Sequence, residues 1–355
     1  MPPLSFYAGS TALKTIQNNG ISADMFSAIL GASGGPKWFV LTGLDKVLFN
    51  DFLHSSNNHI DIIGSSVGAF RASCFMQEDP GAAINRLAEA YSKTVYSDKP
   101  SAEEITEKGI ELLYYMMGPN GVKEALEAVN KTAHIIIARC HGLTSYESKV
   151  KQFAGLAIAA GRNAISRKKL EKSFTRLIMS TNHKGLSFSE KVNIKTEQAV
   201  LNKDNYLDAL MASGSIPAVI KGVRNLAGVK KGMFRDGGII DYHFDMRINT
   251  PKLVLYPHFY SKITPGWFDK SIKSRQCHPA SYDNVLLVAP SEEFVSTLPY
   301  SKIPDRKDFE TMAAEQRQSY WETVISESDR LAEHFFKVIN SPNPSQYIKP
   351  INLKR

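Results

Sequence analysis

The sequence has little cysteine, with only three in 355 residues. Cys74, Cys140 and Cys277 are widely spaced and form no CxxC pair, so they indicate neither a disulfide framework nor a cysteine zinc site. His278 follows Cys277 directly, but one adjacent pair without a second is a weak metal signal. We therefore expect a chain from a reducing compartment, with no metal and no other cofactor.

The sequence also has no long hydrophobic run. The longest stretch of small apolar residues, 154–161, is far shorter than the roughly 20 residues that span a bilayer. The first residues combine no basic start with an apolar core, so they do not read as a secretory signal. We expect a cytoplasmic protein, whose contact with a membrane would be peripheral.

Internal repeats and low-complexity tracts are absent too, which excludes solenoids and propellers. Hydrophobic residues make up 43% and charged residues 22% of the chain, as in ordinary soluble globular proteins. The 43 basic residues outnumber the 35 acidic ones, for a net charge of +8. This excess favours anionic surfaces, either nucleic acid or anionic lipid. Because no nucleic-acid-binding module is recognisable, we predict no nucleic-acid partner.

Short apolar runs alternate with helical patterns in the first part of the chain. Strands are predicted at 26–33, 59–65 and 133–140. The segments between them have helical periodicity, at 36–53, 67–77, 81–94 and 101–129. Such alternation is typical of an α/β fold with a central, mainly parallel sheet and helices on both faces, in three layers.

The later part of the chain is predicted in less regular order. A basic helix is expected at 162–176, and a long amphipathic helix at 307–338 as a C-terminal helical extension. Further expected elements are strands at 189–196, 254–260 and 284–290 and a helix within 202–217. We divide the chain into an N-terminal segment (1–25), a core (26–245) and a C-terminal part of the same domain (246–355).

The stretch GSSVG follows the apolar run at 60–63 and precedes a helical pattern. A serine nucleophile must stand clear of its own backbone, and a sharp strand-to-helix turn achieves this. Such a turn leaves no room for side chains two residues before and after the nucleophile, where this sequence has Gly64 and Gly68. The pattern makes Ser66, rather than Ser65, the candidate nucleophile.

A second glycine-rich stretch, SGGPK, also lies between an apolar run and a helix. The amides of Gly34 and Gly35 could donate to an oxyanion, because no Cβ blocks the approach. A phosphate-binding P-loop needs glycine before its lysine and Ser or Thr after it. Here Pro36 precedes Lys37 and Trp38 follows it, which argues against nucleotide binding.

A third stretch, DGG, starts at Asp236. By itself this is a common turn signal. Beside the other two stretches, Asp236 becomes a candidate base for the serine, provided that burial raises its proton affinity. Gly237 and Gly238 would allow the loop to close against the nucleophile turn.

Together, SGGPK (33–37), GSSVGA (64–69) and DGG (236–238) resemble the patatin-like phospholipase family, in which such motifs occur in this order. The resemblance implies a serine acyl hydrolase that cleaves acyl esters of lipids, of phospholipase A or lysophospholipase type, through an acyl-enzyme. The sequence departs from the family pattern at Ser33 and Trp38, two positions where the family usually has glycine. Trp38 could narrow or line the acyl entrance.

The resemblance also assigns roles to residues of this sequence. It implies Ser66 as nucleophile and Asp236 as its partner in a catalytic dyad. The implied oxyanion hole comprises Gly34, Gly35 and Val67, and the implied supporting residues are Gly64, Gly68, Gly237, Gly238 and Lys37.

Two alternatives remain open. A Ser-His-Asp carboxylesterase could use one of the histidines that follow Asp236, namely His243, His258 or His278. A catalytically weak lipid-binding protein could instead use the basic segment 162–176 and an aromatic cluster, for which packing over the sheet edge is the plainer explanation. That cluster comprises Tyr256, Phe259, Tyr260, Trp267 and Phe268.

Overall fold

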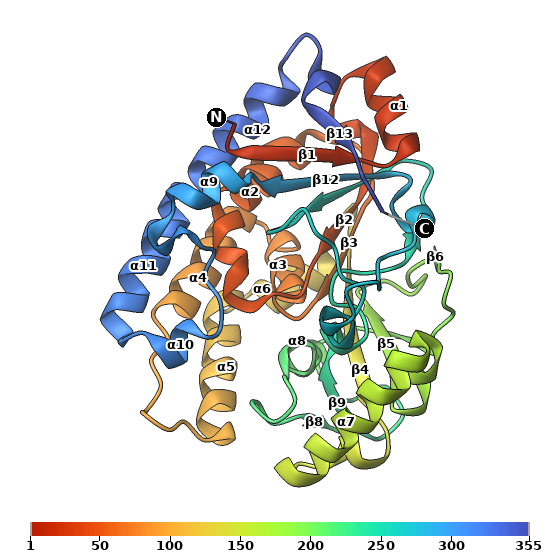
Figure 1. Ribbon diagram of the computed structural model, residues 1–355, viewed down its shortest axis with the longest axis vertical. Coiled ribbons are helices and arrows are strands. Elements are labelled where there is room, and N and C mark those ends of the chain that lie inside the picture. Colours follow the sequence, from red (N-terminus) through yellow and green to blue (C-terminus); the bar gives the residue numbers. More distant parts are fainter. Residues whose placement is uncertain (1, 354–355) are drawn as a thin grey trace.

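A single large sheet runs through the protein. The computed structural model describes residues 2–353, and within them eleven strands form this sheet (Figure 1). In chain order they are β1 (Leu4–Ala8), β2 (Phe26–Gly31), β3 (Ile60–Ser65), β4 (Lys131–Cys140), β5 (Phe174–Ser180), β7 (Thr196–Val200), β8 (Val223–Arg224), β9 (Met233–Asp236), β11 (Leu253–Pro257), β12 (Val285–Pro290) and β13 (Ile348–Pro350). A separate two-stranded sheet joins β6 (Phe188–Ser189) to β10 (Arg247–Ile248).

The centre of the main sheet is parallel. Its order is β13-β1-β12-β11-β2-β3-β4-β5-β7, and the neighbours from β12 to β4 all run parallel. Antiparallel pairs occur where β1 joins β12 and where β5 and β9 join β4. The central strands β2, β3 and β4 are mostly apolar and almost wholly buried, as strands covered on both faces are.

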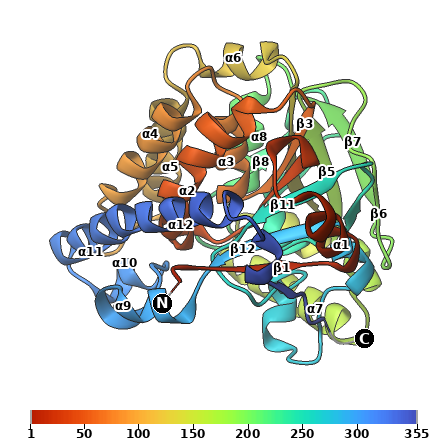
Figure 2. The ribbon, with the colours of Figure 1, turned by 90° about the horizontal axis from the view of Figure 1, so that it is seen from above.

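Helices cover both faces of the sheet. Figure 2 shows α3 and α4 on one side and α1 and α7 on the other. The predicted α/β class, with a mainly parallel sheet between helices, is confirmed. The helices are α1 (Ser10–Asn19), α2 (Thr42–Val47), α3 (Val67–Phe75), α4 (Pro80–Ser92), α5 (Ala102–Met117), α6 (Gly121–Glu127), α7 (Lys149–Ile165), α8 (Tyr206–Gly214), α9 (Glu292–Thr297), α10 (Asp308–Thr311), α11 (Ala314–Glu327) and α12 (Asp329–Ile339).

The prediction of a helix at 162–176 is wrong. α7 ends at Ile165, the backbone of Ser166 is extended, and a short 3-10 helix occupies 167–172. From Phe174 the chain becomes a fully buried strand, because its apolar side chains belong to the core. The strand expected at 189–196 is also misplaced, since the strand that joins the sheet, β7, begins only at Thr196.

The long helix expected at 307–338 is broken into α10, α11 and α12. The backbone is extended at Met312 and Ala313, which separates α10 from α11. Ser328 separates α11 from α12, and its hydroxyl accepts a hydrogen bond from the Gly43 amide at 2.7 Å. The apolar spacing across these breaks follows the core and not one helix axis. No helix among residues 2–353 is both long and apolar enough to span a membrane.

Both ends of the described chain add strands to the same edge of the sheet. β1 pairs with β12, with Leu4 opposite Pro290, and β13 pairs with β1, with Phe6 opposite Ile348. The described residues before 26 and after 245 thus contribute strands to the same sheet as residues 26–245.

Three glycines allow helix α3 to approach the sheet backbone to backbone. Gly31 on β2 and Gly64 on β3 are register partners. A Cβ added to Gly68 would lie 1.8 Å from the Gly31 carbonyl oxygen, and one added to Gly64 would lie 2.2 Å from the Gly68 oxygen. Only glycine fits at these positions, as the sequence pattern around Ser66 requires.

We predict that Gly68→Ala destabilises the fold by about 1–3 kcal/mol or more, because the added methyl group meets rigid backbone. Gly161→Ala is the matched control: its Cβ would meet nothing within 4 Å, and alanine favours the helix. Denaturant unfolding of both variants measures the difference. Equal stability of Gly68→Ala and the wild type would contradict this packing.

Candidate active site

Ser66 occupies the turn between β3 and α3. Its backbone has φ 56° and ψ −129°, a strained conformation for a residue other than glycine. The strain is held by a relay: the Ser66 amide donates to the Ser213 hydroxyl at 2.9 Å, and that hydroxyl donates to the Ile136 carbonyl at 2.8 Å. Neighbouring Ser65 is fully buried, and its hydroxyl accepts a hydrogen bond from the Ser33 hydroxyl. The Ser65 hydroxyl is therefore not presented at the tip of the turn as that of Ser66 is.

The strand register brings Asp236 to Ser66. In β4, Ile136 lies opposite Ser65 of β3, and the next residue, Ile137, lies opposite Asp236 of antiparallel β9. Asp236 therefore stands at the carboxyl end of β3, where the Ser66 hydroxyl donates to its Oδ2 at 2.9 Å. The Gly238 amide donates to Oδ1 at 2.7 Å, which fixes the orientation of the carboxylate.

Asp236 differs from the other buried aspartates. Asp45, Asp241, Asp269 and Asp308 each form an ion pair with an arginine or lysine, whereas Asp236 forms none within the described chain. Burial raises the pKa of Asp236, and Arg306 and the bonds from Ser66 and Gly238 oppose the rise. A carboxylate with raised proton affinity, bonded to a hydroxyl, is suited to accept that proton.

The glycine-rich loop lies beside this pair. Gly35 has φ +56°, in the left-handed region that favours glycine. The amides of Gly34 and Gly35 donate no hydrogen bond to any described residue outside their own short helix, Gly35–Leu41. Val67 is the first residue of α3, where an amide has no acceptor in its own helix. Gly34 lines the same cavity as Ser66, and Val67 follows Ser66 directly in the chain. Backbone amides without an acceptor at such a place can donate to a negative oxygen.

The supporting glycines are positions of close approach. A Cβ on Gly237 would lie 2.1 Å from the Ile136 oxygen, and one on Gly238 would lie 2.5 Å from the Ser33 hydroxyl. That hydroxyl donates to Ser65 Oγ at 3.0 Å. Ser33, which stands where the resemblance expects glycine, thus ties the glycine-rich loop to the end of β3 and needs Gly238 opposite it.

The structure places Trp38 away from the pocket. Its side chain is fully buried and its Nε1 donates to Asp45 at 2.6 Å, in a core that also holds the Arg71–Asp45 ion pair. The expectation that Trp38 could narrow or line the acyl entrance is therefore wrong. The helix Gly35–Leu41 turns this ring inward, against Phe39.

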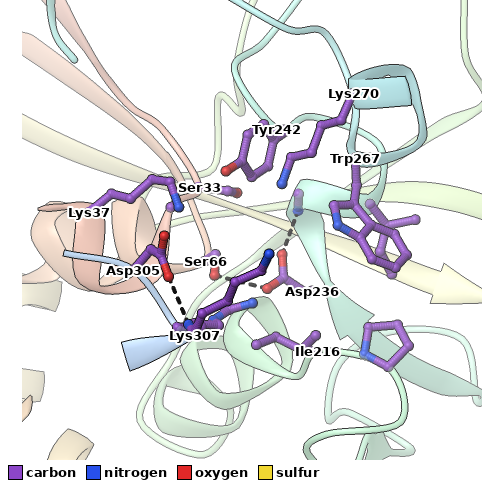
Figure 3. A pocket seen from close by; sticks show the side chains of 15 residues that line it. Ser33, Lys37, Ser66, Ile216, Asp236, Tyr242, Trp267, Lys270, Asp305 and Lys307 are labelled. Atoms are coloured by element: carbon purple, nitrogen blue, oxygen red, sulfur yellow. Dashed lines mark hydrogen bonds between the residues drawn. The ribbon is translucent and has the colours of Figure 1, made fainter. Parts of the chain in front are cut away.

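Ser66 and Asp236 open into a cavity of about 350 Å³ (Figure 3). Its apolar wall includes Ile216, Pro217 and Trp267. Sequence reasoning missed most of its lining from the later chain, because these residues belong to no recognised motif and only folding brings them to the site. They are Tyr242, Lys270, Asp305, Arg306 and Lys307. The charge cluster 305–307 was visible in the sequence, but nothing in its spacing linked it to Ser66.

The three candidate histidines do not join the pair. None of His243, His258 and His278 hydrogen-bonds to Ser66 or Asp236 in the described chain. His243 and His258 are buried, and burial lowers the pKa of His258 to about 3 and that of His243 well below its usual value. Within residues 2–353, no group of three or more His, Cys, Asp or Glu side chains is placed to hold a metal ion.

Comparison with known proteins adds little. No family model and no curated protein matches the sequence. Among solved structures, the crystal structure of VipD from Legionella pneumophila matches with 12% identity and a TM-score of 0.29, covering 77% of this chain and 56% of VipD. The chain thus spans little more than half the length of VipD, and a likeness this weak supports no argument about function.

We predict that Asp236→Asn increases the free energy of unfolding at neutral pH. The pKa of Asp236 is raised in the folded state, so ionisation opposes folding above that pKa and has no effect below the pKa of the unfolded chain. The advantage of asparagine should therefore disappear in acid.

Denaturant unfolding of both proteins across the acidic range measures this trend. A stability difference that stayed constant with pH would show that Asp236 has an ordinary pKa. Asp208→Asn is the control, since Asp208 lies on α8 outside the cavity.

Proposed function

We propose that the protein is a serine acyl hydrolase that uses a Ser66–Asp236 dyad. The observation that carries this proposal is the 2.9 Å bond from the Ser66 hydroxyl to a buried aspartate without an ion-pair partner. The strained turn at Ser66 and the amides of Gly34 and Gly35 support it. An activated hydroxyl beside free amide donors is the arrangement that acyl transfer requires.

In the proposed mechanism, the Ser66 Oγ attacks the ester carbonyl carbon while Asp236 takes the hydroxyl proton. The amides of Gly34, Gly35 and Val67 stabilise the negative oxygen that develops. The tetrahedral adduct then collapses, and the leaving alcohol takes the proton back from Asp236. Water, deprotonated by the same carboxylate, then attacks the acyl-enzyme. As the bond to Ser66 breaks, the Ser66 oxygen takes the proton back from Asp236, and the carboxylic acid is released.

The geometry favours this dyad over a Ser-His-Asp triad. A triad places a histidine between serine and aspartate, but here the two side chains bond directly. The Nδ1 atoms of His243 and His258 face backbone groups of Thr264 and Tyr260 instead.

The resemblance to patatin-like phospholipases supports lipid acyl esters as substrates, of phospholipase A or lysophospholipase type. The apolar wall of Ile216, Pro217 and Trp267 beside Ser66 is suited to an acyl chain. The cavity volume of about 350 Å³ lies near the lower end for ligand sites. It accommodates the ester and part of a chain, and the remainder would extend beyond the rim.

The proposal includes peripheral contact with an anionic lipid surface, through α7. Val150 is 80% exposed and Phe153 59%, on a helix that also exposes Lys149 and Lys151. Exposed apolar side chains flanked by lysines are typical of helices that lie on anionic bilayers. α7 packs against the short helix Trp267–Ser271, which contributes to the cavity, so a lipid on α7 would lie close to the site. The aromatic cluster contributes less, since Tyr256 and Phe259 are buried.

Ser66→Ala and Asp236→Asn should each lower the hydrolysis of acyl esters by about 1000-fold or more, since members of one catalytic unit fail together. The double variant should be no worse than the worse single variant. Ser326→Ala is the control, because this serine is exposed on α11, outside the cavity. A panel of short and long acyl esters measures the rates, and full activity in Ser66→Ala would refute the dyad.

Val150→Asp should weaken co-sedimentation with vesicles containing anionic lipid, and added salt should weaken that of the wild type. Val129→Asp is a matched control. Val129 is 79% exposed, but it lies just before the start of β4, whereas α7 follows the end of that strand. Equal binding by both variants would exclude α7 as the docking helix.

A further inference from the structure

Cationic side chains from three separate parts of the chain meet at the cavity. Lys37 comes from the glycine-rich loop, Lys270 from the short helix Trp267–Ser271, and Arg306 and Lys307 from the segment before α10. Figure 3 shows the side chains of Lys37, Lys270 and Lys307 around Ser66 and Asp236. The lining contains four cations but only two carboxylates, of Asp236 and Asp305.

These cations have no ion-pair partner in the described chain, unlike the buried arginines of the core. The Lys270 ammonium lies 3.6 Å from the centre of the Tyr242 ring, and Arg306 hydrogen-bonds to Tyr91. Neither contact neutralises a charge. The cluster therefore leaves an excess of positive potential next to the proposed ester site.

The charges also repel one another. Partial burial at the rim, with repulsion from Lys37 and Arg306, lowers the pKa of Lys270 to about 7, and Asp236 opposes this. Burial likewise lowers the pKa of Lys37, while Asp305 opposes the change. Holding cations this close costs free energy, which an anion bound among them would return.

We propose that Lys37, Lys270, Arg306 and Lys307 bind an anionic group of the substrate, a phosphate or a carboxylate, next to the scissile ester. This inference rests on the proposed function and narrows its substrate class to anionic acyl esters. Lys270, Arg306 and Lys307 are exposed, so an anion can reach them from solvent, and Lys37 is half-buried in the lining.

A second cavity explains how such a substrate could fit. This space of about 680 Å³ shares Lys37, Tyr242 and Lys270 with the catalytic cavity. The two lysines thus lie where the cavities meet, with Phe259 and Val295 among the walls beyond them. A substrate whose anionic group lay between Lys37 and Lys270 would have its ester directed toward Ser66. The second cavity would be free for the part of the substrate on the other side of the anionic group.

Binding of hexyl phosphate, measured by calorimetry, tests the site without depending on hydrolysis. We expect Lys270→Gln to weaken binding by about tenfold or more, as for the loss of a charged hydrogen bond. Lys273→Gln is the control, because it removes the same charge from an exposed lysine outside both cavities. Inorganic phosphate forms a separate arm and shows whether the free anion suffices.

Equal affinity of the wild type and Lys270→Gln for hexyl phosphate would overturn the proposal, as would no binding by either protein.

Hydrolysis of a matched ester pair tests specificity. Oleoyl lysophosphatidic acid and mono-oleoylglycerol differ only in the phosphate, and both can be presented in the same neutral detergent micelles. We expect a higher kcat/KM for the phosphate ester, and a fall of about tenfold or more in the ratio of the two values in Lys270→Gln but not in Lys273→Gln.

The two proposals fail in different ways. Loss of hydrolysis in Ser66→Ala with an unchanged ester ratio in Lys270→Gln would keep the hydrolase and reject the anion site. Hexyl phosphate binding that depends on Lys270, with no hydrolysis by the wild type, would keep the anion site and reject the dyad.

Discussion

The site depends on the pairing of β4 with two strands of opposite direction. β3 runs parallel to β4 and ends at the Ser66 turn, while β9 runs antiparallel to it and ends at Asp236. Since Ile136 and Ile137 are consecutive, a shift of one residue in either register would move Asp236 out of reach of the hydroxyl. The rest of the site is built around this meeting of strand ends. The glycine-rich loop, the Ser213 relay and the Gly238 amide each fix one side of it.

The buried aspartates of the core and of the site have different partners. Asp45, Asp241 and Asp269 are neutralised by arginines at 2.6–3.0 Å, which makes them structural. Asp236 is held by a hydroxyl and an amide, and the cations nearest to it line the cavity. The fold thus keeps an unpaired carboxylate and unpaired cations within one small space. Unpaired charges of this kind cost stability, and proteins retain them where they have chemical use.

Much of this could be predicted from the sequence, since the information was local. The strands around 26–33, 59–65 and 133–140 are apolar runs with clear ends, and the glycines near Ser66 report the space that their turn leaves. The breaks at Met312 and Ser328 could not be predicted, because the apolar spacing continues across them. The lining from Lys270 and Arg306 was equally hidden. Those residues reach the site only because β11 pairs in parallel with β2 and β12 with β11, which brings the segments after these strands to the edge where β3 ends.

The pairing of β1 with β12 has a consequence for the synthesis of the protein. β1 is translated some 280 positions before its partner β12, as the pairing of Leu4 with Pro290 shows. On the ribosome, the backbone groups of this apolar strand stay unpaired with β12 until β12 has emerged. The nascent chain therefore exposes an aggregation-prone segment while the residues between β1 and β12 are synthesised, and chaperones that hold extended apolar strands could bind it during that time.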